Sequence, residues 1–345
     1  VFVTATEPLI FPRTQIKPLV DRDNYFRKLK RVRLKPEISN PLTIEEFSNL
    51  TMPEVCTSDK RFLFIFNTIG SAKDFYNNLK DYGIAKNDMT FLSTHVIPGE
   101  RLERIENIRN GDKRIVVSTQ LVEAGVDIDF DIVYRDFAPL DSINQAALRF
   151  NLNGLSAGGE VRIIRLVDEK TGRDFSSYIY SRNSILLDIT RKILSDKTEI
   201  PESDFLNLIE SYYALVSGSK TDRESRDVLE AFYRLNYDGD KGISSFSLID
   251  EDYEKVDVFI QFDATAVDLW EQFLRISHMP DFIERKNEYE KIKNALHEYT
   301  VSVPARGDLN LPAIQESMPF VAFDQLDEYY DAETGYKLKG GVAIW

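Results

Sequence analysis

Hydroxyl, amide and imidazole side chains follow three short apolar runs of this sequence. Ligands of open α/β sheets bind at the carboxyl ends of the strands, so residues in these positions can meet one ligand. Neutral hydrogen-bonding groups there suit the grip of a phosphate backbone. Taken singly, each group could equally cap a helix or a turn, but three groups in register favour a site. The groups are Asn67 and Thr68; Ser93, Thr94 and His95; and Ser118, Thr119 and Gln120.

Periodicity indicates the elements that would position these groups. Residues 61–167 alternate short apolar runs with amphipathic stretches, which is typical of β-α-β units. Five strands with crossover connections predict an α/β fold with a doubly wound, mostly parallel sheet. Ser71 is expected to cap the first helix and Gly83 to end it. The expected strands span 62–66, 89–92, 114–117, 131–134 and 161–167, with further helices from Pro98 and over 141–150.

The flanking regions differ from this segment. Residues 1–60 predict two strands and one short helix, and the pattern beyond residue 185 is mainly helical with a few short strands. Before residue 61, strands are expected at 1–5 and 30–35 and a helix at 43–49. Beyond residue 185, helices are expected at 185–195, 203–216, 223–235, 264–276 and 281–298, and strands at 256–262, 300–304 and 318–324.

Charge is distributed unevenly along the chain. The net charge of −14 argues against a nucleic-acid partner, but residues 1–200 carry 29 basic and 28 acidic side chains, whereas residues 201–345 carry 14 and 29. The first part can therefore hold a local basic groove, and the acidic last part is a poor phosphate-binding surface. Alternation places Arg31, Arg33 and Lys35 on one face of an expected strand. They could contact phosphates or lie on a solvated edge strand.

Few residues are suited to metal binding or disulfide formation. The single cysteine, Cys56, excludes an internal disulfide and fits a reducing, cytoplasmic location, and we expect it to be a buried, inert thiol. Three histidines leave little material for a metal site, and none is predicted. His95 could contact phosphate or be hydrogen-bonded within its loop. No run of 18 apolar residues predicts a membrane span, and the first residues do not resemble a signal peptide.

Five stretches of the chain resemble helicase motifs III, IV, IVa, V and VI of superfamily 2. The motif V stretch is long and specific, and together with FNTIGSA it is most similar to the CRISPR-associated type I helicase–nuclease family, in the carboxyl-terminal half of that enzyme. Segments 256–274, 289–304 and 329–341 resemble the region that follows the second RecA-like lobe of this family. The motif stretches are TATEP (4–8), FIFNTIGSAKDFY (64–76), LSTHVIPGERL (92–102), VVSTQLVEAGVDIDFD (116–131) and QAALRFNLNG (145–154).

The resemblance implies roles for individual residues. In the family, ATP with Mg²⁺ lies between two RecA-like lobes, so it would bind here only together with the missing first lobe. Catalytic roles fall on Gln145 and Arg149 of motif VI, where an arginine stabilises charge on the γ-phosphate. Gly125 and Asp127 of motif V would face the nucleotide. The residues expected to bind the nucleic acid are Thr4 and Thr6 of motif III, with Asn67, Thr68, Thr94, Ser118, Thr119 and Gln120 at the strand ends.

The chain departs from the family pattern in two ways. Motif VI has Leu148 and Leu152 where the pattern has glycine and a second arginine, and leucine cannot neutralise a phosphate. These leucines could line the nucleotide cleft or pack in a core-facing helix. No phosphate-loop sequence, no acidic magnesium box and no His-Asp dipeptide occurs. Because the chain opens inside motif III, we expect a fragment that begins where the first lobe ends.

Together these observations predict three segments. Residues 1–60 are expected to hold the end of the first lobe and a connector, 61–184 the second RecA-like lobe, and 185–345 an acidic accessory region. The expected function is the second motor lobe of an ATP-dependent, single-stranded DNA helicase in CRISPR interference, inactive as this chain alone. Its expected partners are single-stranded DNA, the first lobe, an HD nuclease domain and a CRISPR RNA-guided effector complex, with no membrane. The alternatives are a lobe of another superfamily 2 helicase, acting on RNA or DNA, and a non-enzymatic scaffold.

Overall fold

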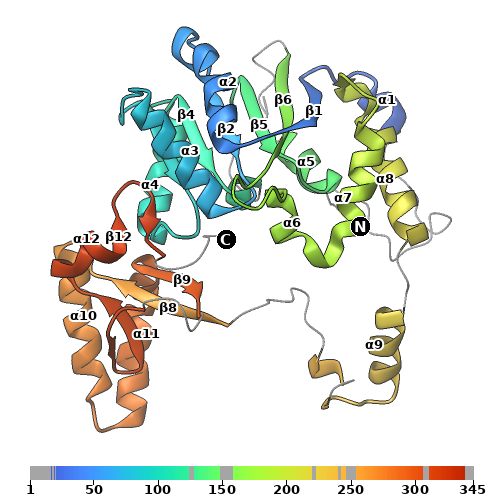
Figure 1. Ribbon diagram of the computed structural model, residues 1–345. Coiled ribbons are helices and arrows are strands. Elements are labelled where there is room, and N and C mark those ends of the chain that lie inside the picture. The colour runs from blue at the N-terminus through green and yellow to red at the C-terminus, as the bar shows by residue number, and fades with distance from the viewer. Residues whose placement is uncertain are drawn as a thin grey trace.

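The computed structural model describes residues 21–123, 128–147, 158–219, 223–239, 242–245, 254–305 and 311–338, together with Lys17 and Leu19. A seven-stranded sheet lies at its centre, in the order β3-β4-β2-β5-β6-β1-β7 (Figure 1). Its neighbouring strands are parallel except β7, which runs antiparallel to β1. The strands are β1 (Val32–Leu42), β2 (Phe62–Ile65), β3 (Met89–Leu92), β4 (Ile115–Ser118), β5 (Ile132–Asp136), β6 (Gly159–Leu166) and β7 (Ile200–Pro201).

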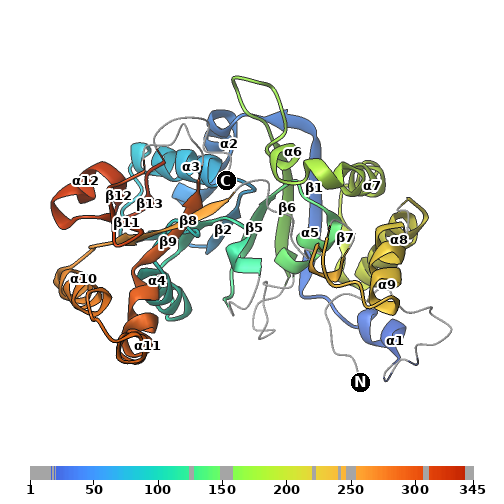
Figure 2. The ribbon, with the colours of Figure 1, turned by 90° about the horizontal axis from the view of Figure 1, so that it is seen from below.

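Helices cover both faces of this sheet (Figure 2). α2 and α3 pack in one apolar cluster and α4, α5, α7 and α8 in another, and alternate residues of β2 point to each, Phe64 to the first and Leu63 to the second. Every residue of β2, β3 and β4 is buried, because a strand between two helical layers has no wet face. The predicted α/β fold is confirmed. The helices are α1 (Arg22–Phe26), α2 (Ile44–Thr57), α3 (Ile69–Asp81), α4 (Pro98–Arg109), α5 (Leu140–Ala147), α6 (Phe175–Ile179), α7 (Ser184–Leu194) and α8 (Phe205–Ser219).

The start of α3 differs from the expectation. Thr68, not Ser71, is the N-cap, and the Thr68 hydroxyl accepts a hydrogen bond from the Ser71 main-chain N–H at 3.1 Å. Both residues are polar and three positions apart, so the local pattern did not distinguish the cap from the first turn. Gly83 follows the end of the helix with φ +86°, a conformation that glycine adopts without strain.

The lobe extends beyond the expected bounds of 61–184 on both sides. β1 is hydrogen-bonded to β6 within the central sheet. Leu187 of α7 and Phe205 and Tyr212 of α8 are buried in the core of the lobe. Local periodicity locates these elements but does not reveal which core they join.

A second, smaller sheet lies beside α4, at the lower left of Figure 1, in the order β10-β11-β8-β9. Its helices α10 and α11 pack against it, and Trp270 of α10 stacks between Phe259 of β8 and Phe320 of β11. We call the unit formed by residues 254–338 the accessory domain. Its elements are β8 (Lys255–Ile260), α10 (Ala264–Ser277), α11 (Phe282–Glu298), β9 (Thr300–Pro304), β10 (Ile314–Gln315), β11 (Met318–Val321) and α12 (Leu326–Tyr329).

A short hairpin joins the accessory domain to the lobe. It consists of β12 (Tyr330–Asp331) and β13 (Gly335–Tyr336) and lies on the loop that follows β3. The Tyr336 N–H donates to the His95 carbonyl oxygen at 2.8 Å, and the Ile97 N–H donates to the Tyr330 hydroxyl at 3.1 Å. Ile97 itself is buried in the core of the accessory domain. The two units therefore share this loop.

One further helix, α9 (Arg223–Tyr233), lies at the lower right of Figure 1. Leu229, Phe232 and Tyr233 on it are largely exposed. Among the helices in the described part of the chain, none is both long and apolar enough to span a membrane.

Candidate functional site at the carboxyl edge of the sheet

The structure brings the three predicted polar groups to one edge of the sheet. β3, β4 and β2 are adjacent and parallel, and Ser118 at the end of β4 is level with Leu92 of β3 and Ile65 of β2. The residues that follow these strands therefore emerge together, as their positions in the sequence predict.

Several of these side chains are committed to bonds within the lobe. Thr68 caps α3, and the Ser118 hydroxyl donates to the Leu92 carbonyl oxygen at 3.0 Å. Thr119 is 5% exposed. These residues fix the loops at the edge of the sheet, and a ligand would meet their main chain more readily than their hydroxyl groups.

Three of the predicted residues are open to a ligand. Thr94 is exposed after β3, and Gln120 is half-buried at the start of a 3₁₀ turn that spans Gln120–Glu123. The Gln120 side-chain amide donates to the main-chain oxygen of Asn67 at 3.0 Å, which holds it at the edge. Gln145 is half-buried on α5.

A fully buried arginine lies beneath these residues, and the sequence analysis did not identify it. Arg135 of β5 has no exposed surface, and its Nε lies 2.9 Å from a carboxylate oxygen of Glu123. Its Nη1 donates to Asn67 Oδ1 at 2.8 Å and its Nη2 to the Ser142 hydroxyl at 2.9 Å. The available signal was the charged pair Arg135-Asp136 at the end of an apolar strand, where both side chains must find partners.

Two further bonds close this group. Ser142 donates to Glu123 Oε2 at 2.8 Å, and the Asn67 amide donates to Asp136 Oδ2 at 2.7 Å. We call Asn67, Glu123, Arg135, Asp136 and Ser142 the Arg135 cluster.

Burial acts differently on the two neighbouring charged residues of the Arg135 cluster, Asp136 and Arg135. Burial raises the pKa of Asp136 to about 7, although Arg135 and donated hydrogen bonds oppose this rise. Burial is the largest single effect on Arg135 and disfavours its charged form, but Glu123, Tyr180 and Asp136 together outweigh it, so the pKa of Arg135 is raised and the guanidinium stays charged.

His95 lies under the hairpin of the accessory domain. It is 2% exposed, and burial, with a smaller effect of the Lys73 ammonium, lowers its pKa to about 3. Its ring is therefore neutral at physiological pH and contributes no charge to the sheet edge.

The basic residues in β1 and directly before it have acidic partners. Arg31 pairs with Glu202, and Lys35 Nζ lies 2.6 Å from a carboxylate oxygen of Glu160. Their charges are balanced within the lobe, which argues against phosphate binding. The alternative of a solvated edge strand is wrong, because β1 lies between β6 and β7 in the sheet.

Cys56 is exposed, so the expectation of a buried thiol was wrong. It is the next-to-last residue of α2, whose inner face is formed by other positions.

Seven residues named from the sequence lie outside the described residues. They are Thr4 and Thr6, Gly125 and Asp127, and Leu148, Arg149 and Leu152.

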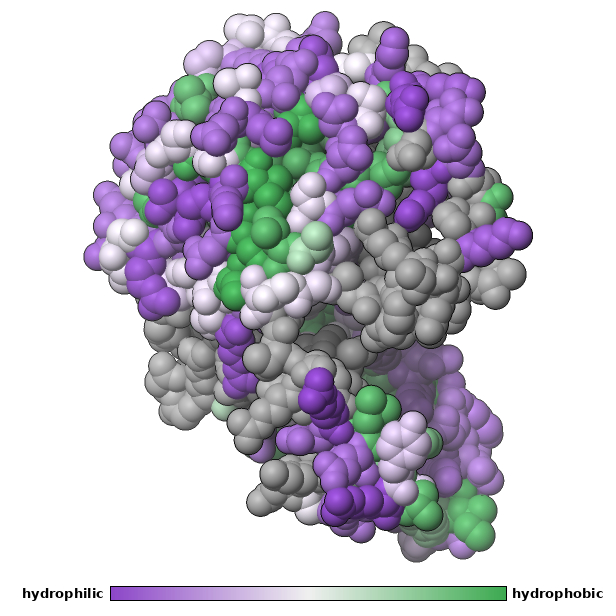
Figure 3. Space-filling view, turned by 90° about the vertical axis from the view of Figure 1, so that its right-hand side faces the viewer, coloured by the Kyte–Doolittle hydropathy of each residue, from purple (hydrophilic) through white to green (hydrophobic). Residues whose placement is uncertain are grey.

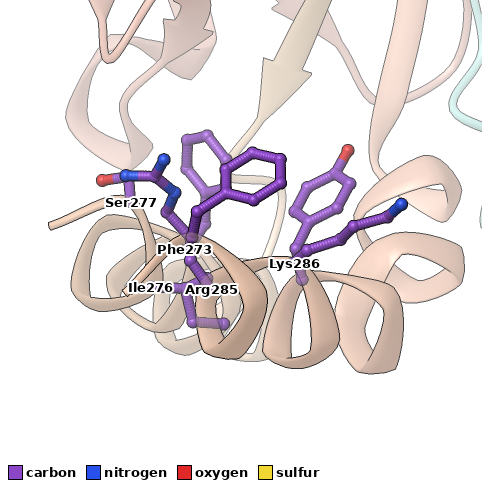
Figure 4. A pocket seen from close by; sticks show the side chains of 7 residues that line it. Phe273, Ile276, Ser277, Arg285 and Lys286 are labelled. Carbon is purple, nitrogen blue, oxygen red and sulfur yellow. The ribbon is translucent and has the colours of Figure 1, made fainter. Parts of the chain in front are cut away.

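Two other features of the described surface are mainly apolar. A cavity of about 300 Å³ between α10 and α11 is lined mainly by apolar side chains such as Phe273 and Ile276, with Arg285 and Lys286 at its margin (Figure 4). Figure 3 shows the side of the molecule that carries α7, α8 and α9, where apolar side chains gather in a stripe and in separate patches. Among the residues that the structure describes, no group of three or more His, Cys, Asp or Glu side chains could hold a metal ion.

Comparison with known proteins agrees with the motif assignment. Residues 58–152 match the family model of the C-terminal domain of the CRISPR-associated nuclease/helicase Cas3. This span contains β2 to α5 and therefore the whole Arg135 cluster. The resemblance to the carboxyl-terminal half of the CRISPR-associated helicase–nuclease is confirmed.

Two relatives show how far the similarity to Cas3 extends. The chain is 31% identical over 143 residues to the Cas3 nuclease/helicase of Methanothermobacter thermautotrophicus, which covers 40% of this chain and 16% of the relative. It is 27% identical over 220 residues to the protein of the same name from Haloferax volcanii, which covers 58% of this chain and 22% of the relative. The matched part is thus about a fifth of either relative.

Structures of Cas3 share the fold over most of the chain. The crystal structure of T. fusca Cas3 with AMPPNP has a TM-score of 0.56 at 16% identity and covers 82% of this chain and 37% of that chain. A structure of a CRISPR RNA-guided surveillance complex, pre-nicking, has a TM-score of 0.53 at 16% identity and covers 91% of this chain and 44% of that one. The similarity extends beyond residues 58–152, so it takes in parts of both the lobe and the accessory domain.

Proposed function

We propose that this chain is the second motor lobe, with an accessory domain, of an ATP-dependent helicase that moves along single-stranded DNA in CRISPR interference. The main support is the meeting of three motif regions at one sheet edge. Asn67 of motif IV, Glu123 within motif V and Ser142, on the helix in which motif VI begins, all contact Arg135. A motor lobe needs these regions in a fixed relation, because nucleotide and strand contact different ones.

The nucleic-acid strand would cross the edge at Thr94 and Gln120, which can donate hydrogen bonds to phosphate oxygens. Asn67, Thr68, Ser118 and the adjacent Thr119 would act by holding the loops. Such neutral contacts position a backbone without reading its sequence.

ATP with Mg²⁺ would bind between this lobe and a first lobe and would supply the free energy for strand movement. In the described part of the chain only Gln145 belongs to the proposed nucleotide-facing residues, and the sequence contains no phosphate-loop lysine. A complete ATP site therefore does not fit within these residues. The first lobe, an HD nuclease domain and a CRISPR RNA-guided complex are the partners that this function would require.

A second candidate is a scaffold that binds its partners without hydrolysing ATP. The observation that favours it is the pair of leucines, Leu148 and Leu152, in motif VI. With arginine lost from the second position, the lobe could retain its fold and its docking role while contributing little to hydrolysis.

ATP turnover separates the two candidates. This chain alone should show none, and joined to an intact first lobe it should show weak DNA-dependent turnover. Leu152→Arg in the joined protein should raise turnover on the order of a thousandfold if the side chain reaches the nucleotide. Leu50→Arg, at an exposed leucine of α2, is the matched control. Equal turnover in all three joined proteins would favour the scaffold.

A further inference from the structure

The Arg135 cluster joins elements that are separated in sequence. Glu123 ends the 3₁₀ turn after β4, Arg135 lies in β5, and Ser142 lies in the first turns of α5. The three side chains form a closed triangle: Arg135 contacts Glu123 and Ser142, and Ser142 donates to Glu123. A shift of α5 relative to the turn must break at least one of these bonds.

The chemistry of the cluster suits positioning more than stability. A buried ion pair gains little over well-packed apolar residues, because both charges lose their water. Its geometric demands are strict, because the planar guanidinium donates in fixed directions. Here two of those directions end on the Asn67 amide oxygen and the Ser142 hydroxyl, while the Glu123 carboxylate is held beside the guanidinium as an ion pair.

The Arg135 cluster lies between residues of motif V and the helix of motif VI, so its fixed geometry can position both. Glu123 lies in motif V, two residues before Gly125, and Gln145 of motif VI lies one helical turn after Ser142 on α5. We propose that Arg135 is a positioning residue that fixes the motif V turn and the motif VI helix relative to each other for ATP hydrolysis. This inference rests on the proposed function.

Two substitutions test the geometry while keeping the buried charge balanced. Arg135→Lys retains the cation but loses the planar fork, and Ser142→Ala removes only the connection to α5. Ser48→Ala is the matched control: Ser48 is a buried serine on α2 that accepts a hydrogen bond from Asn78 of α3 at 2.9 Å, on the opposite face of the sheet. Melting temperatures of all variants are measured alongside.

The kinetic readout uses the joined protein, in which this chain is fused to an intact first lobe. A group that positions the transition state should lower kcat and leave KM for ATP nearly unchanged. We expect kcat to fall at least tenfold in Arg135→Lys and Ser142→Ala, with KM within twofold, and no change in Ser48→Ala. Unchanged kcat in both cluster variants, or an equal loss in Ser48→Ala, overturns the proposal.

Hydrogen exchange of this chain distinguishes failure of the positioning role of Arg135 from failure of the proposed function. Amides of 120–123 and of 140–147 should exchange faster together in both cluster variants and remain unchanged in Ser48→Ala, because one cluster holds both segments. If the joined protein without substitutions shows no ATP turnover, the proposed function fails and the exchange result alone decides whether the cluster couples the two segments. Faster exchange confined to one of the two segments contradicts the proposal that the cluster couples them.

Discussion

Two arginines hold loops at the carboxyl edge of the sheet, and they do so by different means. Arg135 is fully buried and contacts mainly side chains, those of Asn67, Ser142 and the charged Glu123. Arg104 of α4 bonds to main-chain oxygens, those of Phe91, Ala332 and Glu333, and so ties the hairpin to the lobe. The first joins segments of one lobe, whereas the second joins two units of the molecule.

The difference predicts how each region responds to change. In the Arg135 cluster every charge depends on another, so one loss leaves a buried charge without its partner. The hairpin is held by several separate contacts, so no single one carries the whole attachment. They include the Arg104 bonds to main-chain oxygens and the ion pairs of Glu333 with Lys80 and Lys86. The hairpin should tolerate single losses unless the main chain itself cannot fit.

The largest effect is expected for Arg135→Met. It leaves the Glu123 carboxylate buried beside an apolar side chain, and the free energy of unfolding should fall by about 3–5 kcal/mol. The double variant Arg135→Met with Glu123→Gln should recover much of this loss, because neither charge then remains unpaired. Urea unfolding measures both, and a single-variant loss below about 1 kcal/mol would show that the pair is not buried as described.

Gly335→Ala should release the hairpin. Gly335 has φ +80°, and a Cβ there would overlap the carbonyl group of His95. The left-handed backbone alone costs about 1–2 kcal/mol, and the overlap forces the hairpin away from the loop after β3. Gly172→Ala is the matched control, because Gly172 has φ +67° but open space around its Cα.

Limited proteolysis measures whether Gly335→Ala releases the hairpin. Cleavage within 329–337 should accelerate in Gly335→Ala and not in Gly172→Ala. Equal protection in the two variants would mean that the hairpin does not depend on close approach to His95.

The two regions should also respond to pH in opposite directions. Asp136 has a pKa raised to about 7 by burial, so the native state holds its proton more tightly than the unfolded state, and its contribution to stability is lost as pH rises from about 4 to 7. His95 has a pKa lowered to about 3 by burial, so its contribution is lost as pH falls below about 6.5.

Unfolding free energies at pH 5, 6 and 7 test this contrast. Between pH 6.5 and 5, protonation of His95 in the unfolded state should lower the free energy of unfolding of the wild type by about 2 kcal/mol. His95→Gln should abolish this decrease. Asp136→Asn should remove the opposite dependence. Parallel pH profiles of the two variants and the wild type would contradict both assignments.

Local pattern predicted much of the lobe and little of its connections. The runs that became β2 to β6 were recognised because each is apolar and bounded by polar residues. Gly83 ended α3 as expected, but Thr68 replaced Ser71 as its cap. The sequence places Asn67 and Thr94 at strand ends, and parallel pairing then brings them to one edge.

The features that the sequence did not predict depend on contacts between residues far apart in the chain. Arg135 bonds to Asn67 across 68 positions, and Tyr336 reaches His95 from the far end of the accessory domain. Neither contact produces a periodic pattern in the amino-acid sequence. The placement of α7 and α8 in the lobe core also depends on tertiary packing, which is why the expected boundary at 184 fell inside the lobe.

The smallest effect is expected on β1, where charge is neither buried nor shared between units. Arg33 is 44% exposed and lies 3.5 Å from Glu199 and 3.8 Å from Glu160. Exposed pairs of this kind contribute about 0–1 kcal/mol, so Arg33→Ala should change the free energy of unfolding by less than about 1 kcal/mol. It should also leave single-stranded DNA binding unchanged, because acidic partners already balance its charge.

Fluorescence anisotropy with labelled single-stranded DNA compares Arg33→Ala with Thr94→Ala and Gln120→Ala in the full chain. The full chain is needed because α7 and α8 belong to the lobe core, so a cut after residue 184 would expose that core. We expect weak, salt-sensitive binding that falls in the two edge variants and persists in Arg33→Ala. A loss in Arg33→Ala together with a shallower salt dependence would instead assign phosphate contacts to β1, since each lost phosphate contact lowers the salt slope by about 0.7 for single strands.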